Sequence, residues 1–296
     1  PPGRRRTGRG GEPDIRGDGR GRQVLDAIRD ALPAAEVVVL DENDDIASVF
    51  ADVAARASII GVAGGGDGTV ACAAGAAIHA DLPLAVFPAG TFNHFARDIG
   101  CGTVEATVDA VASGSVIKVD AVWLNDSRLI LNTASIGAYP HFVRIRERLR
   151  HRISRPLATA TAIFRVIRKE ANVRIEVEGQ VLDVSLFLIG NSIYQPTGFS
   201  PTRRLRLDDG LLDVRILETG HRWATLRLLG GSLAGGRLER SRLYHEMQVP
   251  EFRFTTVDGP VAVSHDGEVE DSFTDAHFRV DYRRLKVYSP ARSPRF

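Results

Sequence analysis

A glycine-rich stretch directly after a short apolar run constrains this chain more than any other part of its sequence. The run occupies residues 58–63, and Gly64-Gly65-Gly66-Asp67-Gly68-Thr69 follows it. This pattern predicts a buried parallel strand, a tight turn and a helix over the alanine-rich residues 70–80. Glycines at a strand end let the backbone approach a ligand, and the amides that open the next helix suit an anion such as phosphate. The stretch therefore indicates either a phosphate site or a plain structural turn.

Length and composition are those of an ordinary globular protein. The 296 residues are enough for two domains, and 44% of them are hydrophobic and 25% charged. The 38 basic residues are nearly balanced by 37 acidic ones, which argues against a general nucleic-acid binder. Two cysteines without metal-type spacing, Cys72 and Cys101, predict free thiols in a reduced compartment and no zinc site.

The amino-terminal segment differs in composition from the rest. Residues 1–22 hold seven Arg and seven Gly without an apolar run, so we expect disorder there rather than a signal peptide. The chain starts at Pro1, from which we expect a fragment, a processed product or the tail of a longer polypeptide. No stretch of the sequence reaches the ~18 consecutive apolar residues that a membrane-spanning helix needs.

Alternating helix and strand patterns fill residues 23–120, the predicted α/β domain. Helices are expected over 22–32, 46–56, 70–80 and 103–113, and strands over 36–40, 58–63, 84–87 and 116–122. Such β-α-β units form a parallel sheet with ligand sites at the carboxyl ends of its strands. Asp67 follows one strand end, and Gly90 and Thr91 follow the next, before a helix that carries Asn93. We expect these two turns to lie side by side.

From Trp123 onward the sequence predicts mainly strands, hence an antiparallel β-sandwich as a second domain over residues 121–288, followed by a tail at 289–296. The strands are expected over 128–135, 172–178, 181–190, 211–217, 247–256, 260–265 and 276–288, and the last returns to the first domain. A helical insert at 141–169 has nine basic residues and one acidic residue, Glu147. Its charge suits either an anionic membrane surface or an ordinary solvated helix face.

Several motifs in a fixed order resemble the catalytic domain of the diacylglycerol kinase family, in particular its bacterial soluble lipid kinases. Sphingosine and ceramide kinases look similar. The resemblance covers about residues 23–285, and its motifs are Gly64–Thr69, Gly90–Arg97, Asn132–Gly137, Gly190–Tyr194, Leu207–Asp213 and Asp266–Glu268. It implies two domains, an α/β domain with a parallel sheet and a β-sandwich, with the active site in the cleft between them.

The resemblance also implies a nucleotide and metal site. ATP would be the cofactor, held by Leu40, Gly64, Gly65, Gly66, Asp67, Gly68, Thr69, Val70, Thr91 and Asn93. Asp67 would be a catalytic residue that belongs to a water and magnesium network. The Asp208-Asp209-Gly210-Leu211 turn resembles a structural Mg²⁺ loop, in which Asp209 gives its carboxylate and Arg206 and Leu211 their carbonyl oxygens. Mg²⁺ prefers such oxygen ligands.

The resemblance finally implies a catalytic base and a substrate. Asp266 or Glu268 would accept the proton of a lipid hydroxyl while its oxygen attacks the γ-phosphorus of ATP. The chain would then act in the cytoplasm, peripheral to the inner face of the membrane, on a diacylglycerol-like lipid. A homodimer and an upstream domain stay open.

Two other functions stay open from the sequence. NAD kinases and phosphofructokinases also use a Gly-Gly-Asp-Gly turn. A non-catalytic nucleotide or lipid binding module is the other, because the usual first strand with its Asn-Pro turn is not evident and Ala71, Cys72 and His94 depart from the family pattern.

Overall fold

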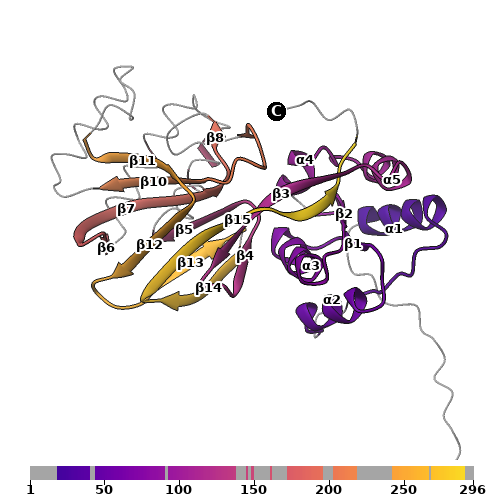
Figure 1. Ribbon diagram of the computed structural model, residues 1–296, viewed down its shortest axis with the longest axis horizontal. Coiled ribbons are helices and arrows are strands. Elements are labelled where there is room, and N and C mark those ends of the chain that lie inside the picture. Colours follow the sequence, from indigo (N-terminus) through magenta and orange to yellow (C-terminus); the bar gives the residue numbers. More distant parts are fainter. Residues whose placement is uncertain are drawn as a thin grey trace, which may run out of the picture.

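The computed structural model describes most of the chain as an α/β part beside a β-rich part (Figure 1). The described residues are 19–40, 44–90, 93–137, 145, 148–149, 161, 172–195, 203–218, 242–266 and 268–290. Most of the predicted basic insert at 141–169 and residues 1–18 of the Arg/Gly-rich segment lie outside these ranges. Within them, no helix has the length and apolar character to span a membrane.

The α/β part follows the predicted alternation closely. Its elements are α1 (Gly19–Ala31), α2 (Ile46–Ala54), β1 (Ile60–Ala63), α3 (Asp67–Ala80), β2 (Leu84–Phe87), α4 (His94–Asp98), α5 (Val104–Ala112) and β3 (Val116–Leu124). Strands β1 and β2 pair in parallel, and α3 connects them as one β-α-β unit. The last strand, β15 (Asp275–Tyr288), lies parallel to β2 with Val287 opposite Leu84. The predicted return of the final strand to the first domain is therefore confirmed.

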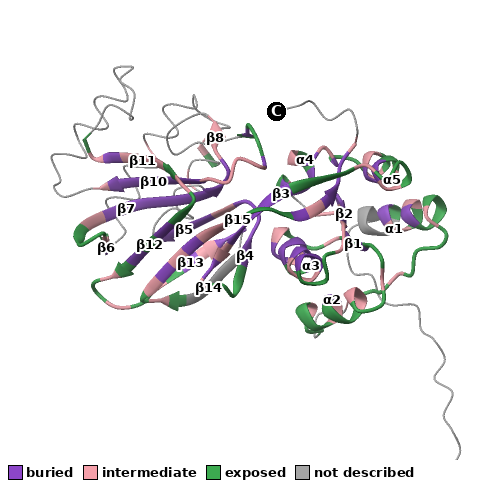
Figure 2. Ribbon diagram, viewed as in Figure 1, coloured by how far each residue is buried: buried purple, intermediate pink, exposed green. Residues whose placement is uncertain are grey.

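Helices cover both faces of this sheet at β2, which explains why this strand is apolar throughout. All four residues of β2 are buried (Figure 2). Leu84 and Val86 pack with α2 and α3, whereas Ala85 and Phe87 pack with α1 and α5. Side chains alternate between the faces of a strand, so a strand with helices on both sides needs apolar residues at every position.

The β-rich part consists of antiparallel strands. Its elements are β4 (Arg128–Ile130), β5 (Thr133–Gly137), β6 (Val173–Val177), β7 (Gln180–Asn191), β8 (Tyr194–Gln195), β9 (Arg203–Arg204), β10 (Leu212–Glu218), β11 (Tyr244–Val249), β12 (Glu251–Thr256), β13 (Val261–His265) and β14 (Glu268–Phe273). Its hydrophobic core contains four aromatic rings in mutual contact: Phe187, Phe252, Phe254 and Phe278.

Strands β3 and β15 run through both parts of the molecule. They pair antiparallel at residues 116–119 with 285–288, and again at 121–124 with 278–281. Between these two regions the register shifts, and Arg283 adopts a positive φ of 50°. Phe278 lies in the core of the β-rich part, whereas Leu285 and Val287 lie in the core of the α/β part. One continuous pair of strands therefore connects the two cores.

The sequence-based assignment fails in several places. The expected strand 128–135 is two strands, β4 and β5, and the short strands β8 and β9 were not expected. Residues 36–40 form no strand, since they pair with none of the described strands and Val38 and Val39 are exposed. Helix α1 begins at Gly19, inside the segment for which we expected disorder. The expected strand 247–256 is two strands separated at Pro250, and β14 was not anticipated. β-branched residues favour a strand, but only a neighbour with free backbone groups completes one.

Candidate functional site

The glycine turn after β1 has the backbone that the sequence predicts. Gly64 and Gly65 have positive φ values of 113° and 73°, which L side chains rarely adopt. A Cβ atom on Gly65 would lie 2.3 Å from Oγ1 of Thr69, so this glycine also packs against the first turn of α3. Gly66 precedes α3 as its N-cap, and Asp67, Gly68 and Val70 follow in the opening turn. The turn thus presents backbone amides at a helix amino terminus.

The second turn, after β2, lies directly against the first. A Cβ atom on Gly90 would be 2.5 Å from the carbonyl oxygen of Gly65, so only glycine fits at this contact. Asn93 fixes the second turn: its Oδ1 accepts the Gly90 N–H at 2.8 Å, and its Nδ2 donates to the Gly90 carbonyl at 2.7 Å. The expectation that the two turns lie side by side is confirmed. Thr91 lies outside the described residues.

Asp266 is buried in the turn between β13 and β14, with a positive φ of 46°. Its carboxylate accepts three backbone N–H groups, from Leu131 at 2.8 Å, Asn132 at 2.8 Å and Thr133 at 3.2 Å. Burial raises the pKa of Asp266 to about 6, whereas the Leu131 and Asn132 amides act in the opposite direction. This carboxyl therefore titrates much closer to neutral pH than an exposed one.

Asp67 is close enough to Asp266 for the two carboxylates to repel each other. Its negative charge contributes to the raised pKa of Asp266. Burial raises the pKa of Asp67 itself, while His94 and Arg204 oppose that change. The fold therefore brings together an acidic residue of α3 and one of the β-rich part, two of the three predicted catalytic residues.

The predicted metal loop lies between β9 and β10. Asp209 accepts the Ile193 N–H through Oδ2 and the Leu211 N–H through Oδ1, each at 3.1 Å. The Leu211 carbonyl accepts the Ser192 N–H at 2.9 Å. The described residues contain no cluster of three or more His, Cys, Asp or Glu side chains suited to a metal. A carboxylate with two backbone carbonyls is still a donor set that fits Mg²⁺, because all its ligands are hard oxygens.

Asp120 of β3 supports this loop, although the sequence reasoning passed over it. Its carboxylate accepts the Gly210 N–H at 2.6 Å and the Arg283 N–H at 2.7 Å. Burial raises the pKa of Asp120, and the nearby Asp209 and Asp208 act in the same direction. The sequence signal for this role was an acidic residue in the middle of the predicted strand 116–122, which is otherwise mainly apolar.

Arg204 is the other residue that the sequence reasoning missed. It is 2% exposed and donates to Asp98, Leu131, Asn132 and Asn191, which lie in three separate segments of the chain. It is one of three arginines close together in the sequence, with Arg203 and Arg206, and nothing in this pattern indicates that it is buried.

Two further predicted residues have less definite surroundings. Leu40 is half-buried and packs against the core beside α2 and α3, but it belongs to no strand. Glu268 is the first residue of β14, and its side chain lies outside the described residues.

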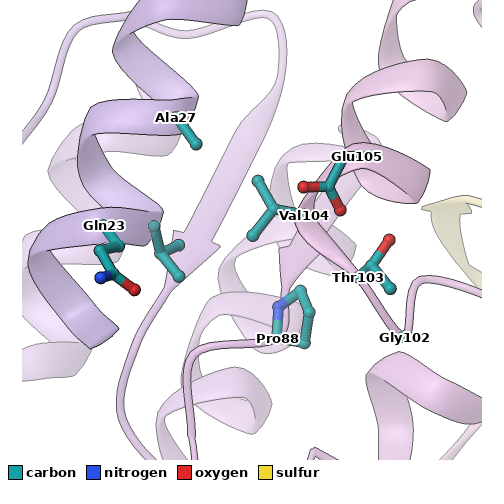
Figure 3. Close-up of a pocket in the computed structure, with 8 residues that line it drawn as sticks. Gln23, Ala27, Pro88, Gly102, Thr103, Val104 and Glu105 are labelled. Atoms are coloured by element: carbon teal, nitrogen blue, oxygen red, sulfur yellow. The ribbon is translucent and has the colours of Figure 1, made fainter. Parts of the chain in front are cut away.

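A separate cavity of about 300 Å³ lies between α1 and the turn that opens α5 (Figure 3). It is lined by Gln23, Val24, Ala27, Pro88, Gly102, Thr103, Val104 and Glu105. None of these eight is a predicted nucleotide, metal or catalytic residue. This cavity is therefore distinct from the site at the two glycine turns.

Comparison with known families matches both parts of the chain. Residues 15–124 match the family described as diacylglycerol kinase catalytic domain. Residues 141–289 match the family described as YegS C-terminal NAD kinase beta sandwich-like domain. These matches confirm the predicted fold class, an α/β domain followed by a β-sandwich.

Individual relatives agree with this result. A probable lipid kinase YegS-like of Pseudomonas aeruginosa is 28% identical over 285 residues, which cover 92% of this chain and 90% of that protein. A diacylglycerol kinase of Mycobacterium tuberculosis is 27% identical over 220 residues, 70% of each chain. The crystal structure of a diacylglycerol kinase from Bacillus anthracis has a TM-score of 0.61 at 19% identity and covers 93% of both chains. The last similarity concerns the fold alone.

Alanine substitutions in the glycine turn should distinguish a position that requires glycine from one that accepts a side chain. We expect Gly65→Ala to lower the free energy of unfolding by roughly 2 kcal/mol, because its φ is 73° and the new Cβ would collide with Thr69. Gly66→Ala is the matched control, since its φ is negative and a Cβ there would have no heavy atom within 4 Å. It should cost under about 1 kcal/mol. Urea unfolding of the two variants measures this, and equal losses would contradict the prediction.

Proposed function

This chain belongs to the diacylglycerol kinase catalytic domain family, and on that premise we propose that it is an ATP-dependent lipid kinase. Its acceptor is the hydroxyl of a diacylglycerol-like lipid, which it meets as a peripheral protein at the cytoplasmic face of a membrane. The observation that carries the proposal is the approach of the buried Asp266 to Asp67 beside the glycine turn. Phosphate transfer requires a proton acceptor close to the bound phosphates.

We assign the ATP phosphates to the two adjoining turns. The backbone amides of Gly65 to Thr69 and those near Asn93 would hold the phosphates, because the first amides of a helix have no carbonyl one turn earlier to bond. Val70 would lie beside them, with its own N–H donating to the Gly66 carbonyl at 3.3 Å. Leu40 would contact the nucleotide. Fixed amides also stabilise the negative charge that develops on the transferred group.

We assign the base role to Asp266. The lipid hydroxyl loses its proton to the Asp266 carboxylate, its oxygen bonds to the γ-phosphorus, and the bond to the β-phosphate oxygen breaks to release ADP. Three backbone N–H groups fix the carboxylate, so that it holds one orientation while it accepts the proton. Mg²⁺ would neutralise phosphate charge near Asp67, and a second Mg²⁺ would be held by Asp209, Arg206 and Leu211.

The first experiment measures transfer of labelled phosphate from ATP with Mg²⁺ to diacylglycerol in mixed micelles. Asp266→Asn should lower kcat by roughly 10²- to 10⁴-fold, because an amide cannot accept the proton of the lipid hydroxyl. Glu268→Gln, two residues away, is the matched control and should retain transfer, and Asp67→Ala should lose it. Equal activity of wild type and Asp266→Asn would contradict the assignment of the base. Transfer to NAD but to no lipid would replace the proposed function, and ATP binding without any transfer would indicate a binding module.

The pH dependence of kcat/KM should report the unusual pKa of Asp266. Since burial raises this pKa to about 6, the carboxyl is protonated and inactive below that pH and becomes an effective base above it. We therefore expect kcat/KM to rise through pH 6 and then level off, with the same acid limb in Glu268→Gln. The native fold should be verified at each pH by circular dichroism. An acid limb near pH 4, typical of an exposed carboxyl, would contradict the prediction.

The proposed metal loop can be tested without any lipid or nucleotide. A ligand that binds only the native state raises stability, so Mg²⁺ in place of EDTA should raise the Tm of the wild type by a few degrees. Asp209→Asn should abolish this increase, because it removes the carboxylate ligand. The matched control is Asp208→Asn, whose carboxylate accepts from Arg206 at 3.1 Å at the surface and should leave the increase unchanged. An increase that survives in Asp209→Asn would contradict the site.

A further inference from the structure

Arg204 places a full positive charge inside the protein, and every donor of its guanidinium group has an acceptor within reach. Nε donates to Asp98 at 2.7 Å, and Nη2 reaches the same carboxylate at 2.6 Å. Nη1 donates to the carbonyls of Leu131 at 2.6 Å and Asn191 at 3.4 Å, and Nη2 donates to Oδ1 of Asn132 at 3.1 Å. Only the planar fork of an arginine can serve so many directions at once.

These acceptors belong to elements that are far apart in the sequence. Asp98 ends helix α4 of the α/β part, directly after the second turn. Leu131 and Asn132 connect β4 to β5, and Asn191 ends β7 in the β-rich part. The rings of Phe95 and Tyr194 lie 5.9 and 5.5 Å from the guanidinium carbon. Arg204 therefore connects helix α4, which follows the second glycine turn, directly to the β-rich part through polar contacts.

The two loop residues that bind Arg204 also bind Asp266. Leu131 offers its carbonyl to Arg204 and its N–H to Asp266. Asn132 offers its side-chain oxygen to Arg204 and its N–H to Asp266. A continuous set of hydrogen bonds thus leads from Asp98 through Arg204 and this loop to the Asp266 carboxylate. Asp67, Arg204 and His265 are the charged or titratable groups that act on Asp266 from the neighbouring elements.

We propose that Arg204 is a positioning residue, which fixes the Leu131–Asn132 loop against helix α4 and so holds the Asp266 carboxylate in place relative to the phosphate turns. This inference deepens the proposed kinase function and rests on it for the kinetic test. Arg204 itself need touch neither ATP nor the lipid.

A second buried arginine forms its shortest ion pair within one strand and reaches Glu246 of the neighbouring strand β11 at 3.9 Å. Arg215 of β10 pairs with Asp213, two residues away on the same strand, through Nε at 3.0 Å and Nη2 at 2.6 Å. Its Nη2 also donates to the Tyr194 carbonyl at 2.7 Å. It has no hydrogen bond to the loop that holds Asp266 among those described. Arg215 therefore supplies a matched control of equal chemistry and burial.

The test compares Arg204→Lys with Arg215→Lys in the full chain. Lysine keeps the charge but lacks the fork, so both variants should lose stability. We expect Arg204→Lys to lower kcat at least tenfold with an ATP Kd within about twofold of wild type, and to move the acid limb of kcat/KM upward by roughly one pH unit. The limb moves upward because the loop amides that favour the charged carboxylate lose their fixed orientation. Arg215→Lys should keep kcat and the limb.

Three results would separate the outcomes. Unchanged kcat and an unchanged limb in Arg204→Lys, with only a lower Tm, would overturn the proposal. If Arg204→Lys does not fold, Asp98→Asn weakens the same contact from the side of α4. A kcat equal to wild type in Asp98→Asn would overturn the proposal, and a lower kcat at unchanged ATP Kd would support it.

If the wild type transfers phosphate to no lipid, the kinase proposal fails. The proposed positioning role of Arg204 is then still decided by carboxyl ¹³C NMR. The Asp266 resonance, assigned with Asp266→Asn, should then titrate at higher pH in Arg204→Lys, and an identical titration would overturn it.

Discussion

Strands β3 and β15 form a continuous pair that contributes to both hydrophobic cores, and the rest of the architecture depends on how they pass from one core to the other. The register shift at residues 282–284 leaves backbone groups without ladder partners at the junction. Asp120 compensates by accepting the Arg283 N–H, and its second oxygen accepts the Gly210 N–H of the proposed metal loop. A hydrogen bond to a charged carboxylate contributes about 1.5–3 kcal/mol. The same carboxylate therefore stabilises the junction and orders a loop beside it.

Asp67 and Asp266 illustrate how this junction can bring together acidic residues from the two parts of the molecule. Asp67 comes from the first turn of α3 and Asp266 from a sandwich turn, nearly 200 residues later in the chain. Neither part alone would raise the pKa of Asp266 so far, because the change combines burial in the sandwich with the charge of the α/β part. Backbone amides limit the change and keep the carboxylate ionised at neutral pH. A buried acid of this kind is stabilised in its neutral form, so its contribution to folding is full below pH 4 and is lost as the pH rises through 6.

Local patterns in the sequence predicted most of what depends on neighbours along the chain. The turn at Gly64 and Gly65 was predicted because positive φ values and close packing demand glycine there. The strand at 36–40 was predicted wrongly, since its valines match a strand but pair with none of the strands that the structure describes. Arg204 could not be predicted at all, because each of its acceptors lies at least 13 residues away. Pairing and long-range polar contacts are properties of the folded arrangement, and residue spacing along one chain does not encode them directly.

The contrast between Arg204 and Arg215 extends this point to function. Burying a guanidinium group is costly, and an apolar residue of similar volume often serves stability equally well. Arg215 meets that cost mainly through Asp213 of its own strand, with the Tyr194 carbonyl of β8 and Glu246 of β11 as further partners. Arg204 instead fixes the relative position of α4, the β4–β5 loop and β7, a constraint that apolar packing could not specify with the same directionality. Because two partners of this buried charge, Leu131 and Asn132, also hold Asp266, its position is better explained by the geometry of that site than by stability.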